Sequence, residues 1–79
     1  MKLIKITSLG CPSCIIMNNL YDKIKDNYNY EVEELDYDFD DVEKYNPGKT
    51  LPVFIKITNK EEKRLVGEKT LEELKSFLD

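Results

Sequence analysis

The spacing of apolar and polar residues changes several times along the chain, and each change predicts a new element. Residues 2–7 (KLIKIT) alternate in polarity and are rich in β-branched side chains, which is typical of a strand. Pro12 follows a turn at 8–10 and suits the first position of a helix. After it, apolar residues recur every four positions and predict one buried helical stripe, made of Ile16, Leu20, Ile24 and Tyr28 and widened by Ile15.

The middle of the chain predicts a strand and a short helix. Residues 31–36 (EVEELD) read as the second strand. Residues 38–45 read as a short helix, in which Phe39 and Val42 would face inward. Residues 46–48 (Asn-Pro-Gly) then predict a turn that ends this helix.

The last third predicts a hairpin and a capped helix. Residues 52–58 (PVFIKIT) are a clear strand, 59–62 are polar and turn-like, and 63–66 return as a further strand before Gly67. Thr70 with Glu73 forms the pattern of a capping box. The helix that follows would bury one apolar face, made of Leu71, Leu74, Phe77 and Leu78.

The predicted order is β-α-β-α-β-β-α, in a single domain spanning 1–79. A strand–helix–strand unit at the start gives two parallel strands with a right-handed crossover. The hairpin adds two antiparallel strands. We therefore expect an α/β protein with a four-stranded mixed sheet and helices on both faces.

Composition narrows the class of partner. The chain has 12 Lys and Arg against 16 Asp and Glu, a formal net charge of −4, and no basic run. Nucleic acid is therefore not expected as a partner, because phosphate binding requires a concentrated positive surface. No segment has the long apolar core of a signal peptide or a membrane helix. We expect a cytoplasmic monomer that does not associate with membranes.

The candidate chemistry is a single Cys-x-x-Cys pair at the predicted junction of strand and helix. Cys11 falls at the helix N-terminus, where unpaired backbone N–H groups and the helix dipole stabilise a thiolate, so it should attack first. Cys14 lies one turn further on, should be more buried, and should attack second. Pro12 stiffens the turn between them. The pattern favours thiol–disulfide exchange.

The cysteine pair also has other interpretations. Cys11 and Cys14 could be two small buried apolar side chains, or half of a zinc site. A structural zinc site needs further ligands, and the chain has no histidine and no other cysteine. One chain therefore cannot complete a thiolate–imidazole site, although two chains sharing their cysteines could.

A second signal lies at 50–53 (TLPV). Pro52 opens a strong strand and cannot donate a ladder hydrogen bond there. It could be an ordinary trans proline at a strand start, or a cis proline, which usually marks a specific purpose. In the cis interpretation Pro52 would lie against the cysteines, and the free backbone of Leu51 could pair with an extended substrate segment.

These two motifs together resemble the thioredoxin and glutaredoxin superfamily, and the resemblance covers nearly the whole chain. It implies a minimal thioredoxin fold in which Cys11 is the nucleophile, Cys14 resolves the mixed disulfide, and Leu51 with Pro52 contacts substrate. We expect Pro12, Ser13 and Thr50 to complete the substrate-binding surface. The resemblance implies a reductase of protein disulfides whose redox group is the cysteine pair itself, with no metal and no further cofactor.

The sequence departs from both branches of that superfamily. Gly10 stands where thioredoxins usually have tryptophan, and Lys5 stands in the place of their buried acid, where we expect it to extend to solvent. The paired glycines and acid that hold glutathione in glutaredoxins are not reproduced, since only Gly67 and Glu68 stand nearby. We therefore expect an electron donor of the thioredoxin-reductase kind rather than glutathione.

Two metal-based alternatives stay open. Copper-chaperone domains also place Cys-x-x-Cys after a first strand, but they usually have a methionine where this chain has Leu9. An iron–sulfur cluster or a zinc ion could instead be shared by Cys11 and Cys14 from two chains, as in some glutaredoxin relatives.

Overall fold

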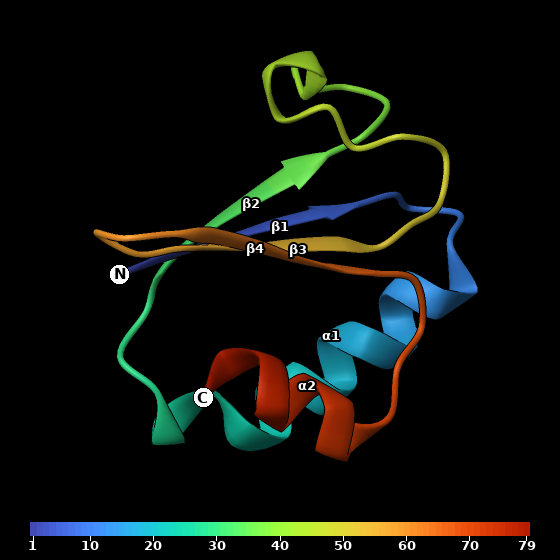
Figure 1. Ribbon diagram of the computed structural model, residues 1–79. Helices are drawn as coiled ribbons and strands as arrows, with labels where there is room; N and C mark the ends of the chain where they lie inside the picture. The colour runs from blue at the N-terminus through green and yellow to red at the C-terminus, as the bar shows by residue number, and fades with distance from the viewer.

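The computed structural model describes residues 1–79 and places the four strands in one mixed sheet (Figure 1). The order across the sheet is β2-β1-β3-β4, with β1 parallel to β2 and antiparallel to β3. β3 and β4 form the predicted hairpin. The α/β class and the four-stranded mixed sheet are confirmed, and the strands are β1 (Lys2–Thr7), β2 (Glu31–Asp36), β3 (Val53–Ile57) and β4 (Glu62–Val66).

The strand register determines which loops meet. Ile6 of β1 lies opposite Val53 of β3, and Val53 lies opposite Val66 of β4. The end of β1, the start of β3 and the end of β4 therefore share one end of the sheet. The loops that follow Thr7, precede Val53 and follow Val66 all leave from that end, which is the right-hand end in Figure 1.

Both α-helices cover the same face of the sheet, α1 (Pro12–Ile24) and α2 (Leu71–Leu78) (Figure 1). Helix α1 starts at Pro12 as predicted, but its buried face is made of Cys14, Met17, Tyr21 and Ile24. The predicted stripe was wrong at Ile15 and Ile16, which are 58% and 42% exposed. Leu20 and Tyr28 lie only at the margin of the core, and a short 3-10 helix, η1 (Lys25–Asn27), ends α1.

Helix α2 begins with the predicted capping box. The hydroxyl of Thr70 accepts a hydrogen bond from the backbone N–H of Glu73, and the Glu73 carboxylate accepts from the backbone N–H of Thr70. These bonds satisfy donors that a helix start otherwise leaves free. The backbone N–H of Thr70, and then its hydroxyl, donate to the Glu73 carboxylate and lower the pKa of Glu73 below its ordinary value. Neither α-helix has the length and apolar character that crossing a bilayer requires.

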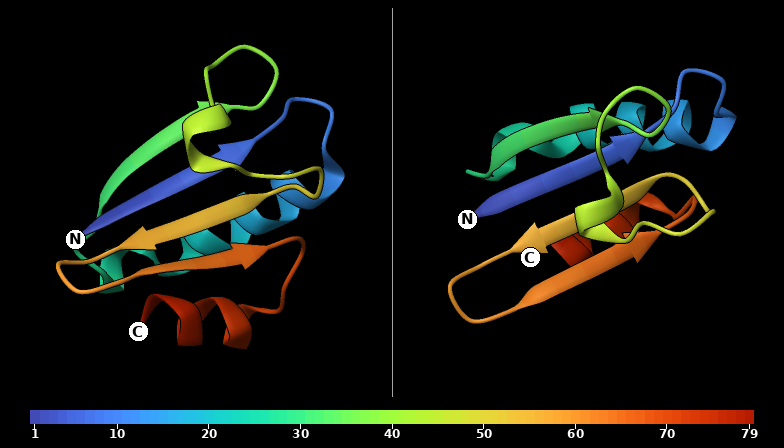
Figure 2. Two further views of the ribbon diagram at one scale, coloured as in Figure 1. Left: turned by 45° about the horizontal axis from the view of Figure 1, so that its top comes forward. Right: turned by 90° about the horizontal axis from the view of Figure 1, so that it is seen from above.

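The opposite face of the sheet carries a loop and one short 3-10 helix, η2 (Glu43–Tyr45), in place of the predicted helix at 38–45 (Figure 2). Val42 is buried as predicted, whereas Phe39 is 79% exposed, contrary to the prediction. The side chain of Asp36 accepts hydrogen bonds from the backbone N–H groups of Asp38 and Phe39. Such local bonds compete with helix formation.

Two lysines on the helix-covered face are buried. The ammonium of Lys5 lies 4.6 Å from the centre of the Tyr21 ring and 3.1 Å from the Glu34 carboxylate. The prediction that Lys5 extends to solvent was therefore wrong. Lys56 donates from its ammonium to the carbonyls of Phe77 and Leu78 at 3.1 and 3.4 Å, which satisfies acceptors at the end of α2. Each buried ammonium therefore has an oxygen partner, as the cost of desolvation requires, and the Glu34 carboxylate that pairs with Lys5 lies at the surface.

Candidate active site

Three loops converge at the end of the sheet where β1 and β4 finish and β3 begins. The backbone N–H of Gly67, after β4, donates to the carbonyl of Pro52 at 2.9 Å. The next turn of that loop reaches α1, because the backbone N–H of Lys69 donates to the sulfur of Met17 at 3.3 Å. Gly67 has φ +86°, a conformation that side-chain-bearing residues rarely adopt. The cysteine helix, the proline turn and the loop after β4 are therefore tied together.

Cys11 caps helix α1 with its own sulfur. It has extended backbone angles, φ −106° and ψ 105°, and the backbone N–H of Cys14 donates to its sulfur at 3.2 Å. Pro12 occupies the start of the helix, where its missing N–H costs no hydrogen bond. The sulfur of Cys11 thus takes the position of a capping oxygen and receives a backbone donor, an arrangement that stabilises negative charge on it.

Cys14 lies beneath Cys11, and only 1% of it is exposed. The structure pairs the two as a disulfide, with their Cα atoms 5.2 Å apart. In the dithiol state, burial and then a hydrogen bond with Cys11 raise the pKa of Cys14 to about 11. The pair therefore consists of an accessible, capped sulfur and a buried thiol that stays protonated at neutral pH.

The proline turn completes the site. The Leu51–Pro52 peptide bond is cis, so the cis interpretation of the sequence is the correct one. Pro52 is buried, Leu51 is half-buried, and Thr50 is exposed. Since Pro52 precedes β3 directly and Cys11 follows β1, the register brings the turn and the cysteine helix to the same end of the sheet.

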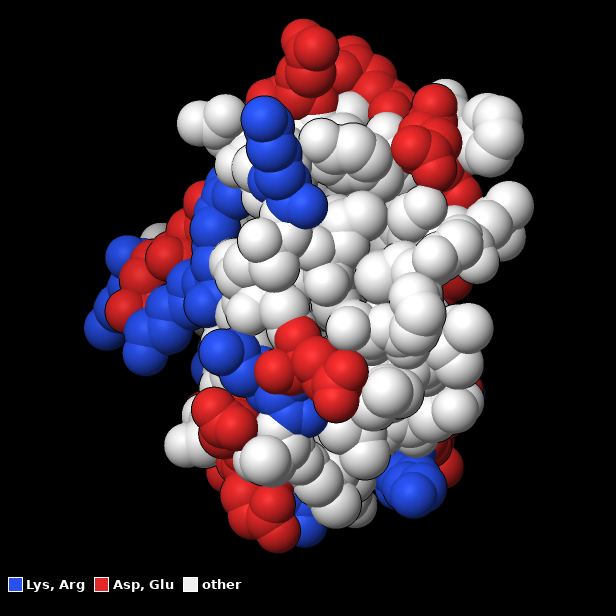
Figure 3. Space-filling model, turned by 90° about the vertical axis from the view of Figure 1, so that its right-hand side faces the viewer, with Lys and Arg blue, Asp and Glu red and all other residues white.

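The surface at this end combines an uncharged area with charged margins. Figure 3 faces this end and shows a broad area without charged side chains right of centre, acidic side chains at the top, over the loop after β2, basic side chains toward the left, and an acidic group with basic side chains against it below the centre. Several apolar residues close to the cysteines or to Gly67 are exposed, namely Leu9 at 82%, Ile15 at 58% and Val66 at 40%. Ser13, between the cysteines, is half-buried.

Two contacts at this site were missed from the sequence. The hydroxyl of Ser8 donates to the carboxylate of Asp38 at 2.9 Å, and the hydroxyl of Ser13 donates to the carboxylate of Glu68 at 3.2 Å. The sequence places Asp38 only at the start of a predicted helix, and Glu68 only where glutaredoxins differ from this chain. The two partners of these bonds are 30 and 55 residues apart in the sequence, and no local sequence pattern indicates a bond between residues so far apart.

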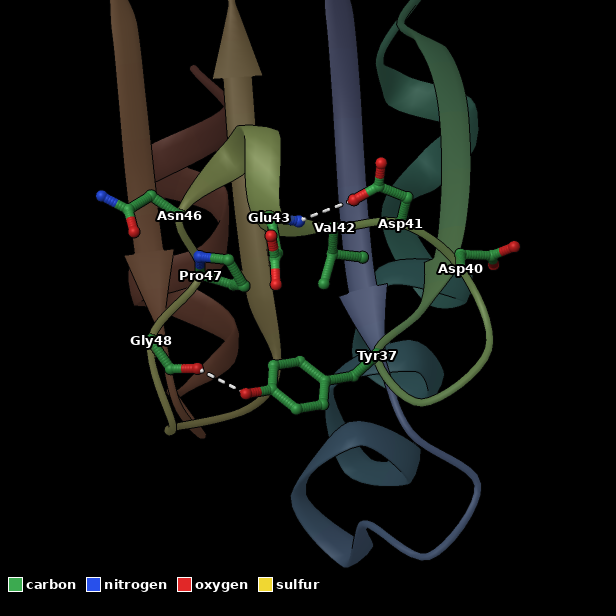
Figure 4. Close-up of a pocket in the computed structure, with 8 residues that line it drawn as sticks. All are labelled: Tyr37, Asp40, Asp41, Val42, Glu43, Asn46, Pro47 and Gly48. Carbon is green, nitrogen blue, oxygen red and sulfur yellow. Dashed lines mark hydrogen bonds between the residues drawn. The ribbon is translucent and has the colours of Figure 1, made fainter.

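The largest cavity lies elsewhere, on the loop-covered face, with a volume of about 680 Å³ (Figure 4). The hydroxyl of Tyr37 crosses it to donate to the carbonyl of Gly48 at 3.0 Å, while the side chain of Asp40 points away from it. The lining of the cavity consists of Tyr37, Asp40, Asp41, Val42, Glu43, Asn46, Pro47 and Gly48 and includes neither cysteine.

The structure does not gather metal ligands around the cysteines. No group of three or more His, Cys, Asp or Glu side chains is placed to share one metal ion. A metal held by Cys11 and Cys14 would therefore need ligands from outside this chain.

Comparison with solved structures identifies the fold. The reduced thioredoxin pre-protein of Schistosoma mansoni matches with a TM-score of 0.78 and 22% identity, over 96% of this chain and 73% of that one. A structure described as a malarial protein matches with a TM-score of 0.77 and 20% identity, over 96% of this chain and 92% of that one. No family model and no curated protein match the sequence. The chain has a thioredoxin-like fold.

Proposed function

We propose that this protein is a thiol–disulfide oxidoreductase that reduces disulfides in other proteins. The observation that carries the proposal is the capped sulfur of Cys11, which receives the backbone N–H of Cys14 at a helix start beside the cis Leu51–Pro52 turn. A thiolate is the attacking species in disulfide exchange, and this position favours it. The thioredoxin-like fold supports the same class of function.

The reaction has two exchange steps. The Cys11 thiolate attacks one sulfur of the substrate disulfide, so that the substrate bond breaks, a mixed disulfide forms and one substrate thiolate leaves. Cys14 then gives up its proton to solvent and attacks the sulfur of Cys11. The mixed disulfide breaks, the Cys11–Cys14 bond forms, and the second substrate thiolate leaves and takes up a proton. Two electrons have passed from the protein to its substrate.

A dithiol reductant must restore the reduced pair after each cycle. We propose a protein donor of the thioredoxin-reductase kind rather than glutathione, because the loop after β4 has Glu68 where a second glycine would be needed. The backbone of Leu51, next to Pro52, would pair with an extended segment of the substrate. Pro12, Ser13 and Thr50 would line the same surface.

Trapping of the mixed disulfide tests this function. Cys14→Ser removes the resolving thiol, so a reduced variant mixed with a disulfide-bonded protein such as insulin should accumulate a covalent adduct that dithiothreitol cleaves. Cys11→Ser is the matched control and should form none, because the thiol that remains is buried. Absence of adducts with Cys14→Ser, together with no reduction of insulin by the native protein, would overturn the proposal.

A further inference from the structure

Two exposed carboxylates are fixed on either side of Cys11 by serine hydroxyls. Ser8 precedes Cys11 by three residues, and its hydroxyl donates to Asp38; its carbonyl also accepts the backbone N–H of Cys11 at 3.3 Å. Ser13 follows Cys11 by two residues, and its hydroxyl donates to Glu68. The first carboxylate comes from the loop after β2 and the second from the loop after β4, so they approach the cysteine helix from different elements.

Neither carboxylate is neutralised by a basic partner. The ion pairs of the structure involve neither Asp38 nor Glu68, and the neighbouring Lys49 and Lys69 form none with them. The loop that holds Asp38 belongs to a segment, 31–48, that has eight acidic residues and one lysine. A partner that approaches the cysteine helix therefore meets one unpaired carboxylate held by Ser8 and another held by Ser13.

The space between the carboxylates is suited to the disulfide itself. Leu9 and Ile15 are exposed next to the cysteines, and a broad part of this surface, mainly right of centre in Figure 3, carries no charged side chain. A target disulfide with its apolar neighbours can lie there, while residues one or two positions away face Asp38 or Glu68. Charges within a Debye length act on the rate of encounter and on the choice between partners.

We propose that Asp38 and Glu68 are specificity-determining residues of the dithiol site, which favour protein disulfides flanked by Lys or Arg and disfavour anionic disulfides. Ser8 and Ser13 are positioning residues that hold the two carboxylates close to Cys11. The proposal rests on the proposed function, because it concerns the choice of substrate in the first exchange step. It also predicts that glutathione disulfide, which is anionic at neutral pH, reacts slowly.

The test measures single-turnover reduction of two synthetic peptides by the pre-reduced protein. Each peptide has one internal disulfide and the same sequence, except that the residues flanking the cysteines are Lys in one and Glu in the other. We expect the Lys peptide to react about tenfold faster at about 20 mM salt, and the ratio to approach one at about 500 mM salt, where charges are screened.

Substitutions distinguish the effect of the two carboxylates near Cys11 from the effect of the protein's net charge on the preference between the peptides. Glu68→Gln and Asp38→Asn should each reduce the preference about threefold and should speed the reaction with glutathione disulfide. Ser13→Ala keeps the net charge but releases Glu68, so it should reduce the preference in the same direction by a smaller factor. Asp26→Asn, in η1 at the far end of α1, removes one negative charge and should leave the preference unchanged. The ratio of two rates does not depend on the amount of folded variant.

Each outcome tests either the proposed function or this inference. Failure of the native protein to reduce either peptide would overturn the function and the inference with it. Equal rates for the two peptides, or a preference that Asp26→Asn alters as much as Glu68→Gln, would overturn the inference and leave the function standing. A preference that survives both Glu68→Gln and Asp38→Asn would do the same.

Discussion

The two faces of the sheet are covered in different ways. On one face, α1 and α2 enclose a cluster of seven buried residues, Leu3, Met17, Tyr21, Ile24, Phe54, Leu74 and Leu78. On the other face, four strand residues are covered by a loop that contributes one buried apolar side chain, Val42. The helix-covered core is thus built from two regular elements, and the loop-covered core depends on a single side chain and its partly buried neighbours.

This difference bears on the site. The buried thiol of Cys14 belongs to the helix that covers the larger core, so its position depends on that packing. Asp38 belongs to the loop over the smaller core, whose local hydrogen bonds rather than a helix hold it in place. The position of the cysteine pair therefore depends on the packing of the helix-covered face. The position of Asp38 depends on the less well-packed, loop-covered face.

The largest effect we expect is the difference in reactivity between the cysteines. With a pKa of about 11, about one Cys14 thiol in 10⁴ is ionised at pH 7. Alkylation of the reduced protein should therefore modify Cys11 and leave Cys14 intact, with the Cys14 rate rising tenfold per pH unit up to about pH 11. Peptide mapping by mass spectrometry measures both. Equal labelling at pH 7 would show that the helix-covered face does not shield Cys14.

Truncation in the helix-covered core should have the largest effect on stability. Leu74 is fully buried, and Leu74→Ala leaves a cavity between α2 and the sheet, which should lower the free energy of unfolding by about 3 kcal/mol. Urea denaturation of the oxidised protein measures it. Phe39→Ala is the control, because an exposed side chain should change the free energy by less than about 0.5 kcal/mol.

Truncation on the loop-covered face should matter less. Val42→Ala removes two methyl groups from the smaller core, so we expect a loss of about 1.5 kcal/mol in the free energy of unfolding. Denaturation under the same conditions gives the value for direct comparison. A loss as large as that of Leu74→Ala would show that the two faces contribute equally, contrary to the comparison above.

The smallest effect concerns the start of α2. Thr70→Ala removes the capping oxygen and should cost about 1 kcal/mol at neutral pH. The backbone N–H of Thr70 and then its hydroxyl donate to Glu73 and lower the pKa of this carboxylate, which therefore stabilises the fold above its ordinary pKa and ceases to do so as pH falls through the lowered value. Thr70→Ala keeps the backbone bond and removes the hydroxyl bond. The difference between Thr70→Ala and the native protein should therefore narrow in acid. A difference that is constant with pH would exclude this coupling.

Much of the fold could be predicted because its signals are local. The alternation in β1, the proline at the start of α1 and the Thr70 capping box each depend on residues close in sequence. The buried face of α1 was predicted wrongly because Ile16 fits an apolar stripe as well as Met17 does. Which of the two is buried depends on which side of the helix faces the sheet. The sequence of the helix alone does not determine that side.

Within the site, too, the residues that belong to local motifs could be predicted and the contacts between distant segments could not. Cys11, Cys14 and Pro52 follow from motifs at strand ends, and the structure brings them to one end of the sheet. The ion pair of the buried Lys5 with Glu34 arises through the parallel pairing of β1 and β2. Such contacts come from topology, so periodicity and spacing along the chain could not reveal them.

The outer strands β2 and β4 each leave one row of backbone groups unpaired, which makes both sides of the sheet templates for another strand. β2 has three glutamates among its six residues, and β4 has three consecutive charged residues, Glu62, Lys63 and Arg64. Charged side chains on an edge oppose the addition of an unrelated strand. The sequence of these two strands therefore protects the protein against aggregation through its own sheet.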